Sequence, residues 1–397
     1  MTSSDLVTGI GKAVVTAFAL AASALTLGQT PGVTDKEIVI GTTMPLTGPA
    51  SGYANAGRSA AGYFKMLNDN GGINGRKINF IIRDDSYSPP KSLEQTRRLV
   101  EQDKVAFIAL PGGSVPALTV RSYLNERKVP QLFVAAALEV FNDPKNFPWT
   151  TGSMPTSFVE GREIARNILR VNPKAKIAAL VENSDNGRGY MKGLYEGLGP
   201  EITKTIREAS FELSDPSVDS QILSLQASGA DTLFVVAPPK ATAQAIRKAY
   251  DAGWRPSQLY ILSWSASVEG TLVPAGLERA KGVYSAVFMK DPTDPQWADD
   301  PGVKEWVASM NKYNPGVSMD ALSRIGWLAA EMVSQVIRQC GNDLSRENVM
   351  RQAARIDMKS PLLLPGVEIK TSPTNFGPIQ QTRMQRFDGE RWALTAP

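Results

Sequence analysis

The segment "NDNGGINGRKINFIIRDDSYSPP", residues 68–90, holds three glycines within five positions, then an apolar run, then two adjacent carboxylates. The helical spacing of Ala60, Phe64 and Leu67 predicts a helix before the glycines, and the apolar run predicts a strand over residues 77–83. A dinucleotide-binding fingerprint needs the opposite order, with its glycines after a strand and before a helix. The segment therefore predicts a helix end and a turn into a strand rather than a phosphate loop.

The individual positions support this interpretation. Gly71 is expected to adopt the left-handed conformation that ends a helix at Asp69-Asn70. Asn and Gly in residues 73–75 tolerate positive φ and are expected to turn the chain into the strand. Arg76 stands where a P-loop requires lysine.

The two carboxylates, Asp84 and Asp85, fall at the carboxyl end of the predicted strand, where ligand sites occur in such folds. Adjacent residues on a strand point to opposite faces, so a paired acid/base role is poor geometry. We expect loop capping and solvation instead.

Short apolar runs alternate with amphipathic stretches along most of the chain, which predicts βα units that feed parallel sheets. Residues 142–155 are rich in Pro, Asn and Gly and are typical of a linker, after which the alternation resumes. The predicted fold class is α/β, with two doubly wound parallel-sheet lobes and a C-terminal hairpin at Asp388-Gly389. Two facing lobes predict a cleft, the usual place for a small-molecule site.

Composition excludes several kinds of chemistry. The chain has 397 residues, no histidine and one cysteine. Without histidine, zinc or iron chemistry and Ser-His or Cys-His catalysis are nearly excluded, and we expect no metal site and no cofactor. Cys340 lies at helical spacing and is expected to be a buried structural thiol.

Charge argues against nucleic acid as a partner. The net charge is +4, with 43 Lys and Arg scattered among 39 Asp and Glu. A nucleic-acid-binding protein more often shows a basic stripe with interleaved aromatic residues, and none is found.

The N-terminus resembles an export signal. Residues 12–28, "KAVVTAFALAASALTLG", combine one lysine with a short apolar stretch, and residues 22–24 offer a small-x-small cleavage site. We predict a signal peptide over residues 1–28 and a periplasmic mature protein. An uncleaved anchor or a misplaced start is the alternative.

Ser114 lies in "LPGGSVP", residues 110–116, between a predicted strand and helix, as a nucleophile elbow would. Pro116 replaces the second glycine, and no histidine is present to activate the serine. We therefore expect no enzyme activity, with a Ser-Lys pair as the remote alternative. Ser114 is better interpreted as a helix N-cap or as a hydrogen-bond donor to a ligand.

Three segments resemble type I periplasmic binding proteins of ABC importers, the leucine/isoleucine/valine-binding family. They are "IVIGTTMPLTGPASGYANAGRSAAGYFKMLNDNGGINGRKINFIIRDDSYSPPKSLEQTRRLV", "FVVAPPKATAQAIRKAYDAGW" and "LYILSWSAS". The resemblance implies a clamshell with a three-crossing hinge, lobe 1 being residues 36–153 plus 284–358 and lobe 2 being 154–283 plus 359–397. It also implies a monomer that binds a small carboxylate and delivers it to an inner-membrane ABC permease.

Ten residues match ligand-binding positions of that family or stand beside them. They are Tyr53, Gly113, Ser114, Ala135, Ala136, Asn186, Tyr190, Pro238, Trp264 and Arg324. Alanine replaces the family's Ser/Thr in the loop at residues 135–137, so one hydroxyl contact is lost. For Trp264 a hinge cover, for Tyr190 helix packing and for Arg324 a solvated position remain the alternatives.

The ligand expectation depends on the segment "SWSAS", residues 263–267. Amino-acid binders of the family place an acid there for the α-ammonium group, and this chain has none. Because an unpaired buried ammonium is costly, we expect an apolar or aromatic acid, with Trp264, Tyr53 and Phe141 as an aromatic wall. A ligand-sensing receptor of the same fold is the alternative function.

Overall fold

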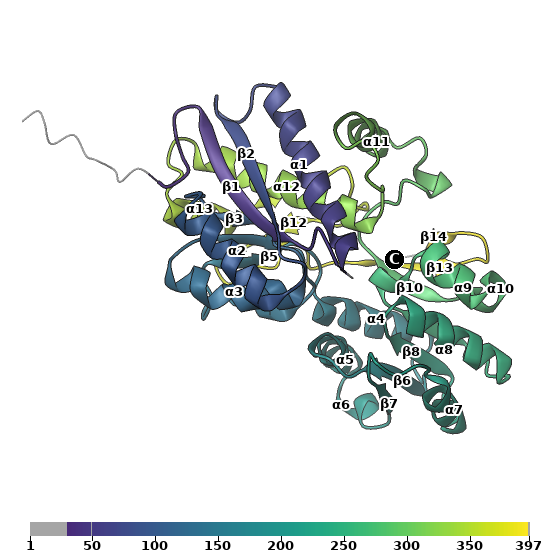
Figure 1. Ribbon diagram of the computed structural model, residues 1–397. Coiled ribbons are helices and arrows are strands. Elements are labelled where there is room, and N and C mark those ends of the chain that lie inside the picture. The colour runs from purple at the N-terminus through teal and green to yellow at the C-terminus, as the bar shows by residue number, and fades with distance from the viewer. Residues whose placement is uncertain (1–29, 49, 396–397) are drawn as a thin grey trace, which may run out of the picture.

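The computed structural model describes residues 30–48 and 50–395 and arranges them in two lobes, each built on its own sheet (Figure 1). The predicted signal peptide lies outside the described residues. In the part of the chain that the structure describes, no helix is long and apolar enough to cross a membrane.

The first lobe contains a five-stranded parallel sheet in the order β2-β1-β3-β4-β5. Its strands are β1 (Glu37–Met44), β2 (Lys77–Asp84), β3 (Ile108–Ala109), β4 (Gln131–Val134) and β5 (Thr150–Gly152). Its helices are α1 (Ala54–Asp69), α2 (Pro89–Glu101), α3 (Ser114–Glu126), α11 (Pro301–Tyr313), α12 (Ala321–Cys340) and α13 (Arg346–Ala353). A short antiparallel ladder joins β11 (Asp357–Met358) to β12 (Ile369–Lys370).

Helices cover both faces of this sheet. On β1, Ile38 and Ile40 face the core shared with α1 and α12, while Val39 faces the core shared with α2 and α3. Since successive side chains of a strand point to opposite faces, these two cores lie on opposite sides of the sheet. The lobe is therefore doubly wound, as predicted.

The second lobe contains a seven-stranded sheet in the order β14-β13-β10-β9-β8-β6-β7. Its strands are β6 (Ile177–Glu182), β7 (Arg207–Phe211), β8 (Thr232–Val236), β9 (Gln258–Ile261), β10 (Tyr284–Val287), β13 (Arg383–Phe387) and β14 (Trp392–Leu394). Its helices are α4 (Ser157–Val171), α5 (Asp185–Leu198), α6 (Pro200–Thr203), α7 (Asp219–Ala227), α8 (Pro239–Asp251), α9 (Val273–Ala275) and α10 (Leu277–Ala280). Strands β13 and β14 form the predicted hairpin, pair antiparallel and extend the otherwise parallel sheet.

Three chain crossings join the lobes, and strand pairing places two of them later than predicted. Residue 284 was the expected start of lobe 1, but β10 pairs with β9 of the second sheet, so this crossing follows Val287. Residue 359 was the expected return to lobe 2, but Leu362 and Ile379 belong to the first lobe's core, so that crossing precedes β13. Apolar runs alone did not reveal which core each run would enter.

Hydrogen bonds tie segments beside the crossings to the first lobe. Ser157 N–H donates to the Ala137 carbonyl over 2.7 Å, and Lys290 N–H donates to the Leu362 carbonyl over 2.8 Å. The Asn142 side-chain oxygen accepts from Phe376 N–H over 2.6 Å. These bonds hold the segments together where the lobes meet.

The glycine-rich turn forms as predicted. Helix α1 ends at Asp69, Gly71 N–H donates to the Asn68 carbonyl, and Gly72 N–H donates to the Leu67 carbonyl. This pair of bonds is a Schellman motif. Both glycines have positive φ, 100° and 79°.

Substituting Gly72 by alanine should destabilise the protein more than the same change at Gly71. Both positions have positive φ, which costs about 1–2 kcal/mol for an L-residue. Only at Gly72 would the new Cβ collide with backbone, at 2.0 Å from the Arg76 carbonyl oxygen, whereas no atom lies within 4 Å at Gly71. We expect Gly72→Ala to lose about 2–4 kcal/mol of unfolding free energy in urea and Gly71→Ala about 1 kcal/mol. Equal losses would contradict this account.

Candidate functional site

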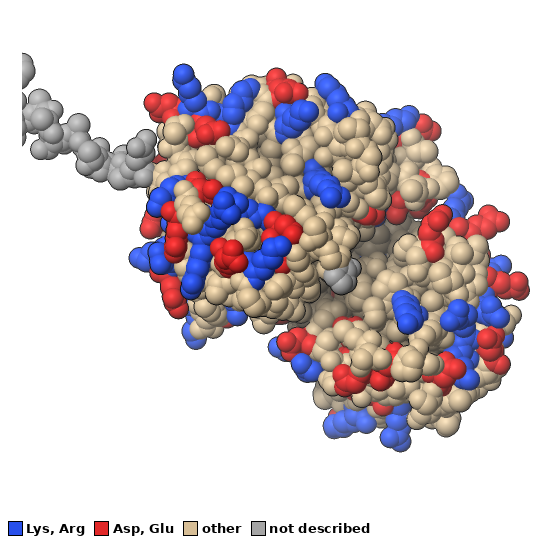
Figure 2. All heavy atoms as spheres, viewed as in Figure 1, with Lys and Arg blue, Asp and Glu red and all other residues tan. Residues whose placement is uncertain are grey.

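The loops that follow the parallel strands of both lobes border a cleft. Figure 2 shows the surface hollowed between the two lobes. Parallel strands place all their carboxyl ends at one edge of a sheet, so the βα loops of each lobe gather on one wall. Tyr53 follows β1, Ser114 follows β3, and Trp264 follows β9 on the opposite lobe.

On the first lobe, Tyr53 stacks against Tyr87, a residue that sequence reasoning did not select. The ring centroids are 5.9 Å apart and the planes differ by 24°. Tyr53 ends a 3-10 turn at Ser51–Tyr53, directly before α1. Both rings are half-buried, so this wall presents a pair of aromatic side chains.

The loops after β3 and β4 lie beside this pair. Gly113 is buried with φ of 86°, and its N–H reaches the carbonyl of Ala135 at 3.3 Å. Helix α3 begins at Ser114 and its N-cap residue is Gly113, so the N-cap role expected for Ser114 is wrong. Ala135 and Ala136 are buried and present mainly backbone.

Arg324 is buried, with only 8% of its surface exposed, so a solvated position is excluded. It lies in the first turns of α12, and its Nη1 is 3.1 Å from Asp291 Oδ1. Neighbouring Asp320 accepts from the Asn55 amide over 2.8 Å, which ties this end of α12 to the start of α1. Among the described residues, Arg324 Nε and Nη1 have no hydrogen bond of good geometry.

On the second lobe, the side chain of Trp264 is exposed at the surface. It is 44% exposed and lies in a 3-10 turn, Ser263–Ser265, at the end of β9. Tyr190, which was a candidate for the ligand site, is 1% exposed and packs in the lobe's core. Burial and the neighbouring carboxyl of Glu160 raise the pKa of Tyr190, and a hydrogen bond from the Trp264 side chain opposes this rise.

Glu160 of α4 lies beneath the same turn. Its carboxyl accepts from Ser263 N–H over 2.7 Å, from the Ser263 hydroxyl over 2.6 Å and from the Tyr190 hydroxyl over 3.4 Å. Burial raises the pKa of Glu160, and the Ser263 donors counteract it. The carboxyl thus fixes the turn that carries Trp264.

A second buried carboxylate, Glu182, ends β6. It accepts from the Ser184 hydroxyl over 2.7 Å and from the Asn186 amide over 3.3 Å, so Asn186 is engaged within its own lobe. Ser184 also caps α5 by accepting from Gly187 N–H over 3.0 Å. The start of α5 therefore already has a protein acceptor, the Ser184 hydroxyl oxygen.

Two further residues expected near the ligand, Pro238 and Phe141, differ in how deeply they are buried. Pro238 is the half-buried N-cap residue of α8, at the end of β8. Phe141 is 1% exposed in a core cluster with Val134 and Leu138. The expectation that Phe141 lines the cleft is wrong, because its ring fills the space beneath the β4 loop.

The described residues offer no metal-binding cluster. Within them, no group of three or more Cys, Asp or Glu side chains is placed to hold a metal ion. Cys340 is buried as predicted, and this burial raises the pKa of its thiol to about 12. A thiol with that pKa is not a nucleophile at neutral pH.

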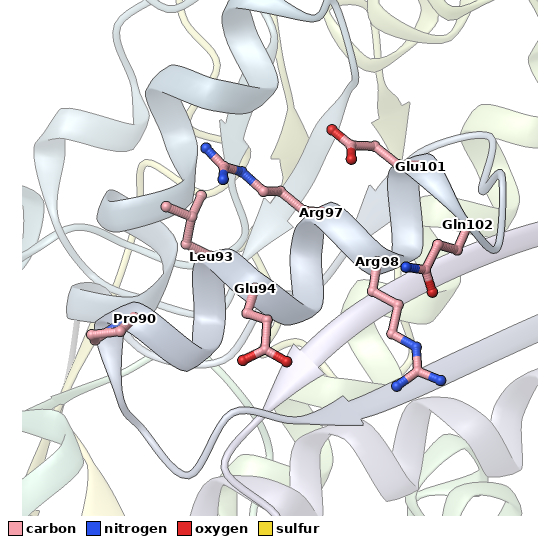
Figure 3. Close-up of a pocket in the computed structure, with 7 residues that line it drawn as sticks. All are labelled: Pro90, Leu93, Glu94, Arg97, Arg98, Glu101 and Gln102. Carbon is pink, nitrogen blue, oxygen red and sulfur yellow. The ribbon is translucent and has the colours of Figure 1, made fainter.

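A separate depression lies on the surface of α2 (Figure 3). Its lining comes from that helix and the residue after it, namely Pro90, Leu93, Glu94, Arg97, Arg98, Glu101 and Gln102. Because one helix surface cannot enclose a ligand, the cleft remains the candidate site.

Two α/β lobes with three crossings and a cleft at the carboxyl ends of their strands define a bilobal ligand-binding protein. The sequence profile of the family described as "Periplasmic binding protein" matches residues 37–391, so the chain belongs to this family of substrate-binding proteins. The resemblance found in the sequence is thereby confirmed.

Two relatives with low sequence identity are also described as binding proteins. The "Amino acid binding protein" of Pseudomonas aeruginosa is 26% identical over 218 residues, covering 50% of this chain and 53% of that protein. The chain thus spans about half the length of this relative. The "Leu/Ile/Val-binding protein homolog 1" of Brucella abortus is 22% identical over 319 residues, covering 78% of this chain and 81% of that protein.

Solved structures share the fold. A branched-chain amino acid ABC transporter protein from Thermus thermophilus, solved with bound valine, has a TM-score of 0.77 at 17% identity, covering 92% of this chain and 96% of that one. A fatty acid ABC transporter substrate-binding protein from Thermomonospora curvata has a TM-score of 0.72 at 19% identity, covering 92% of this chain and 93% of that one. A solute-binding protein from R. palustris, solved in complex with 4-hydroxybenzoate, has a TM-score of 0.71 at 17% identity, covering 88% of this chain and 93% of that one.

Glu160→Gln should change how stability depends on pH. The folded-state pKa of Glu160 is raised, so the wild type loses stability relative to the glutamine variant as pH rises above about 4.5. Ser263→Ala should steepen this loss, because the carboxylate then lacks its 2.6 Å hydroxyl donor. Urea unfolding between pH 4 and pH 8 measures both effects. A stability difference between wild type and Glu160→Gln that stays constant over this range would refute the assignment.

Proposed function

We propose that this protein is the extracytoplasmic substrate-binding component of an ABC importer, which binds a small aromatic or apolar carboxylate between its lobes. The observation that carries the proposal is the pairing of aromatic walls across the cleft. Tyr53 and Tyr87 stack on one lobe, and Trp264 stands 44% exposed on the other. A large apolar side chain exposed at a cleft is typical of a ligand site.

The buried carboxyls argue against an amino-acid ligand. Glu160 and Glu182 lie close to the Trp264 wall, but both accept hydrogen bonds from their own lobe. Both oxygens of Glu160 already accept from protein donors, so a ligand ammonium would compete with those donors for this carboxyl. An acid without an ammonium group avoids that penalty.

Arg324 is the cation proposed to pair with the ligand carboxylate. Its guanidinium is buried beside Asp291, and burial makes an ion pair stronger than it would be in water. Its Nε and Nη1 lack well-aligned acceptors among the described residues. A bound carboxylate would supply such acceptors.

Closure of the lobes would couple binding to transport. A ligand that touches both walls only when they approach shifts the population toward the closed form. Export through the N-terminal signal would place the protein in the periplasm. There it would act as a monomer, and its closed form would bind a membrane permease. Membership of the periplasmic binding protein family supports this role.

A thermal-shift panel tests the ligand class. Three structural neighbours are described with valine, 4-hydroxybenzoate or fatty acid, which suggests L-valine, L-leucine, 4-hydroxybenzoate and octanoate as probes. We expect 4-hydroxybenzoate or octanoate to raise the melting temperature by a few degrees, since ligand at 100 times Kd stabilises by about 2.7 kcal/mol. Arg324→Met should abolish the shift, while Arg338→Met, near the far end of the same helix, should retain it.

The outcomes separate the parts of the proposal. A shift with leucine or valine alone would overturn the ligand class and leave the binding role. A full shift in Arg324→Met would remove that residue from the site. Hydrolysis of any probe derivative that Ser114→Ala abolished would instead reveal an enzyme.

A further inference from the structure

The two adjacent aspartates at the end of β2, Asp84 and Asp85, build a rigid turn that positions Tyr87 on the wall of the first lobe. Ser86 and Tyr87 have φ of 50° and 60°, the left-handed region that non-glycine residues seldom occupy. Asp84 Oδ1 accepts from Ser86 N–H over 3.0 Å, and Asp85 Oδ1 accepts from Tyr87 N–H over 2.9 Å. Each carboxylate thus holds one of the two strained residues.

The surrounding structure fixes both aspartates. Asp84 also accepts from Leu46 N–H over 2.9 Å and from Lys91 Nζ over 2.8 Å, so it joins the β1 loop to α2. Asp85 is fully buried and accepts from the Ser92 hydroxyl over 3.1 Å. Two strained residues persist only where the surroundings determine them, and such strain gathers at functional sites.

The ring of Tyr87 lies directly on Gly113. A Cβ at position 113 would stand 2.4 Å from Tyr87 Cε2 and 3.2 Å from its hydroxyl oxygen, so only glycine admits this ring. The ring also stacks with Tyr53. Tyr87 therefore occupies the space between the β1 loop and the start of α3.

The phenol oxygen of Tyr87 lies at the N-terminus of α3. This helix has 13 residues, and no side chain caps it through a hydrogen bond, so its first N–H groups need acceptors. Burial raises the pKa of Tyr87, while the backbone N–H groups of Val115 and Ser114 approach the phenol oxygen and oppose the rise. The phenol thus stays protonated at neutral pH. Among the described residues, none accepts its proton.

We propose that Tyr87 is a specificity-determining residue, whose hydroxyl, positioned by the start of α3, donates to the ligand carboxylate. The inference rests on the proposed carboxylate-binding function and deepens it. The ring covers the start of α3, so the ligand meets the phenol rather than the backbone N–H of Ser114. The phenol oxygen lies 3.2 Å from the Cβ position of Gly113, the N-cap residue of α3, and the positive end of the helix dipole makes a phenol a stronger hydrogen-bond donor. The aspartate pair positions this residue and does not itself contact the ligand.

The test compares 4-hydroxybenzoate with its neutral analogue 4-hydroxybenzamide by calorimetry, on wild type and Tyr87→Phe. The phenylalanine keeps the ring and its stacking and removes only the hydroxyl. Loss of a hydrogen bond to a charged group should weaken the acid by about 10- to 100-fold and the amide by far less. Tyr195→Phe is the matched control, because Tyr195 donates to Glu208 within the second lobe, and it should leave both affinities unchanged.

Each outcome has a defined meaning. If the acid binds Tyr87→Phe as tightly as wild type, or if acid and amide weaken equally, the inference is overturned and the proposed function stands. If wild type binds neither 4-hydroxybenzoate nor octanoate, the carboxylate function itself fails and the inference fails with it. Urea unfolding of Tyr87→Phe verifies that an altered affinity does not reflect lost folding.

Discussion

Parallel strand pairing is the constraint on which the rest of this molecule depends. Because β1, β3 and β4 run in one direction, the loops after them must meet at one edge of the first sheet. The same holds for β6, β8 and β9 in the second lobe. Three crossings then hold these two edges face to face. Residues separated by more than 200 positions become opposite walls of one cleft without any direct contact.

The walls are stiffened from beneath by buried carboxyls. Asp85 holds the turn that carries Tyr87, and Glu160 holds the turn that carries Trp264. Each accepts a backbone N–H from the turn it supports, which fixes the direction of an aromatic ring. A wall fixed before binding loses less conformational entropy when a ligand arrives.

Short-range rules predicted the local features correctly, whereas contacts between distant segments could not be predicted from the sequence. The turn at residues 71–75 followed from helix-end chemistry, and Cys340 from helical spacing. Tyr87 was missed because its role depends on Gly113, which lies in another βα unit. Phe141 was misplaced because its exposure is set by packing against Val134 and Leu138. One signal for Tyr87 was available, since an aromatic residue two positions after Asp85, in the loop that follows a parallel strand, lies at the ligand edge of such a sheet.

The sequence by itself determined the class of fold, the absence of histidine chemistry, the family resemblance and the loops in which a site would lie. These follow from periodicity, composition and motif order, which involve neighbouring residues. Tertiary structure alone decided that β10 joins the second sheet, that Arg324 is buried beside Asp291, and that two carboxyls support the aromatic walls. Those outcomes depend on which surfaces pack together and exclude water, and such surfaces are formed by residues that lie far apart in the chain.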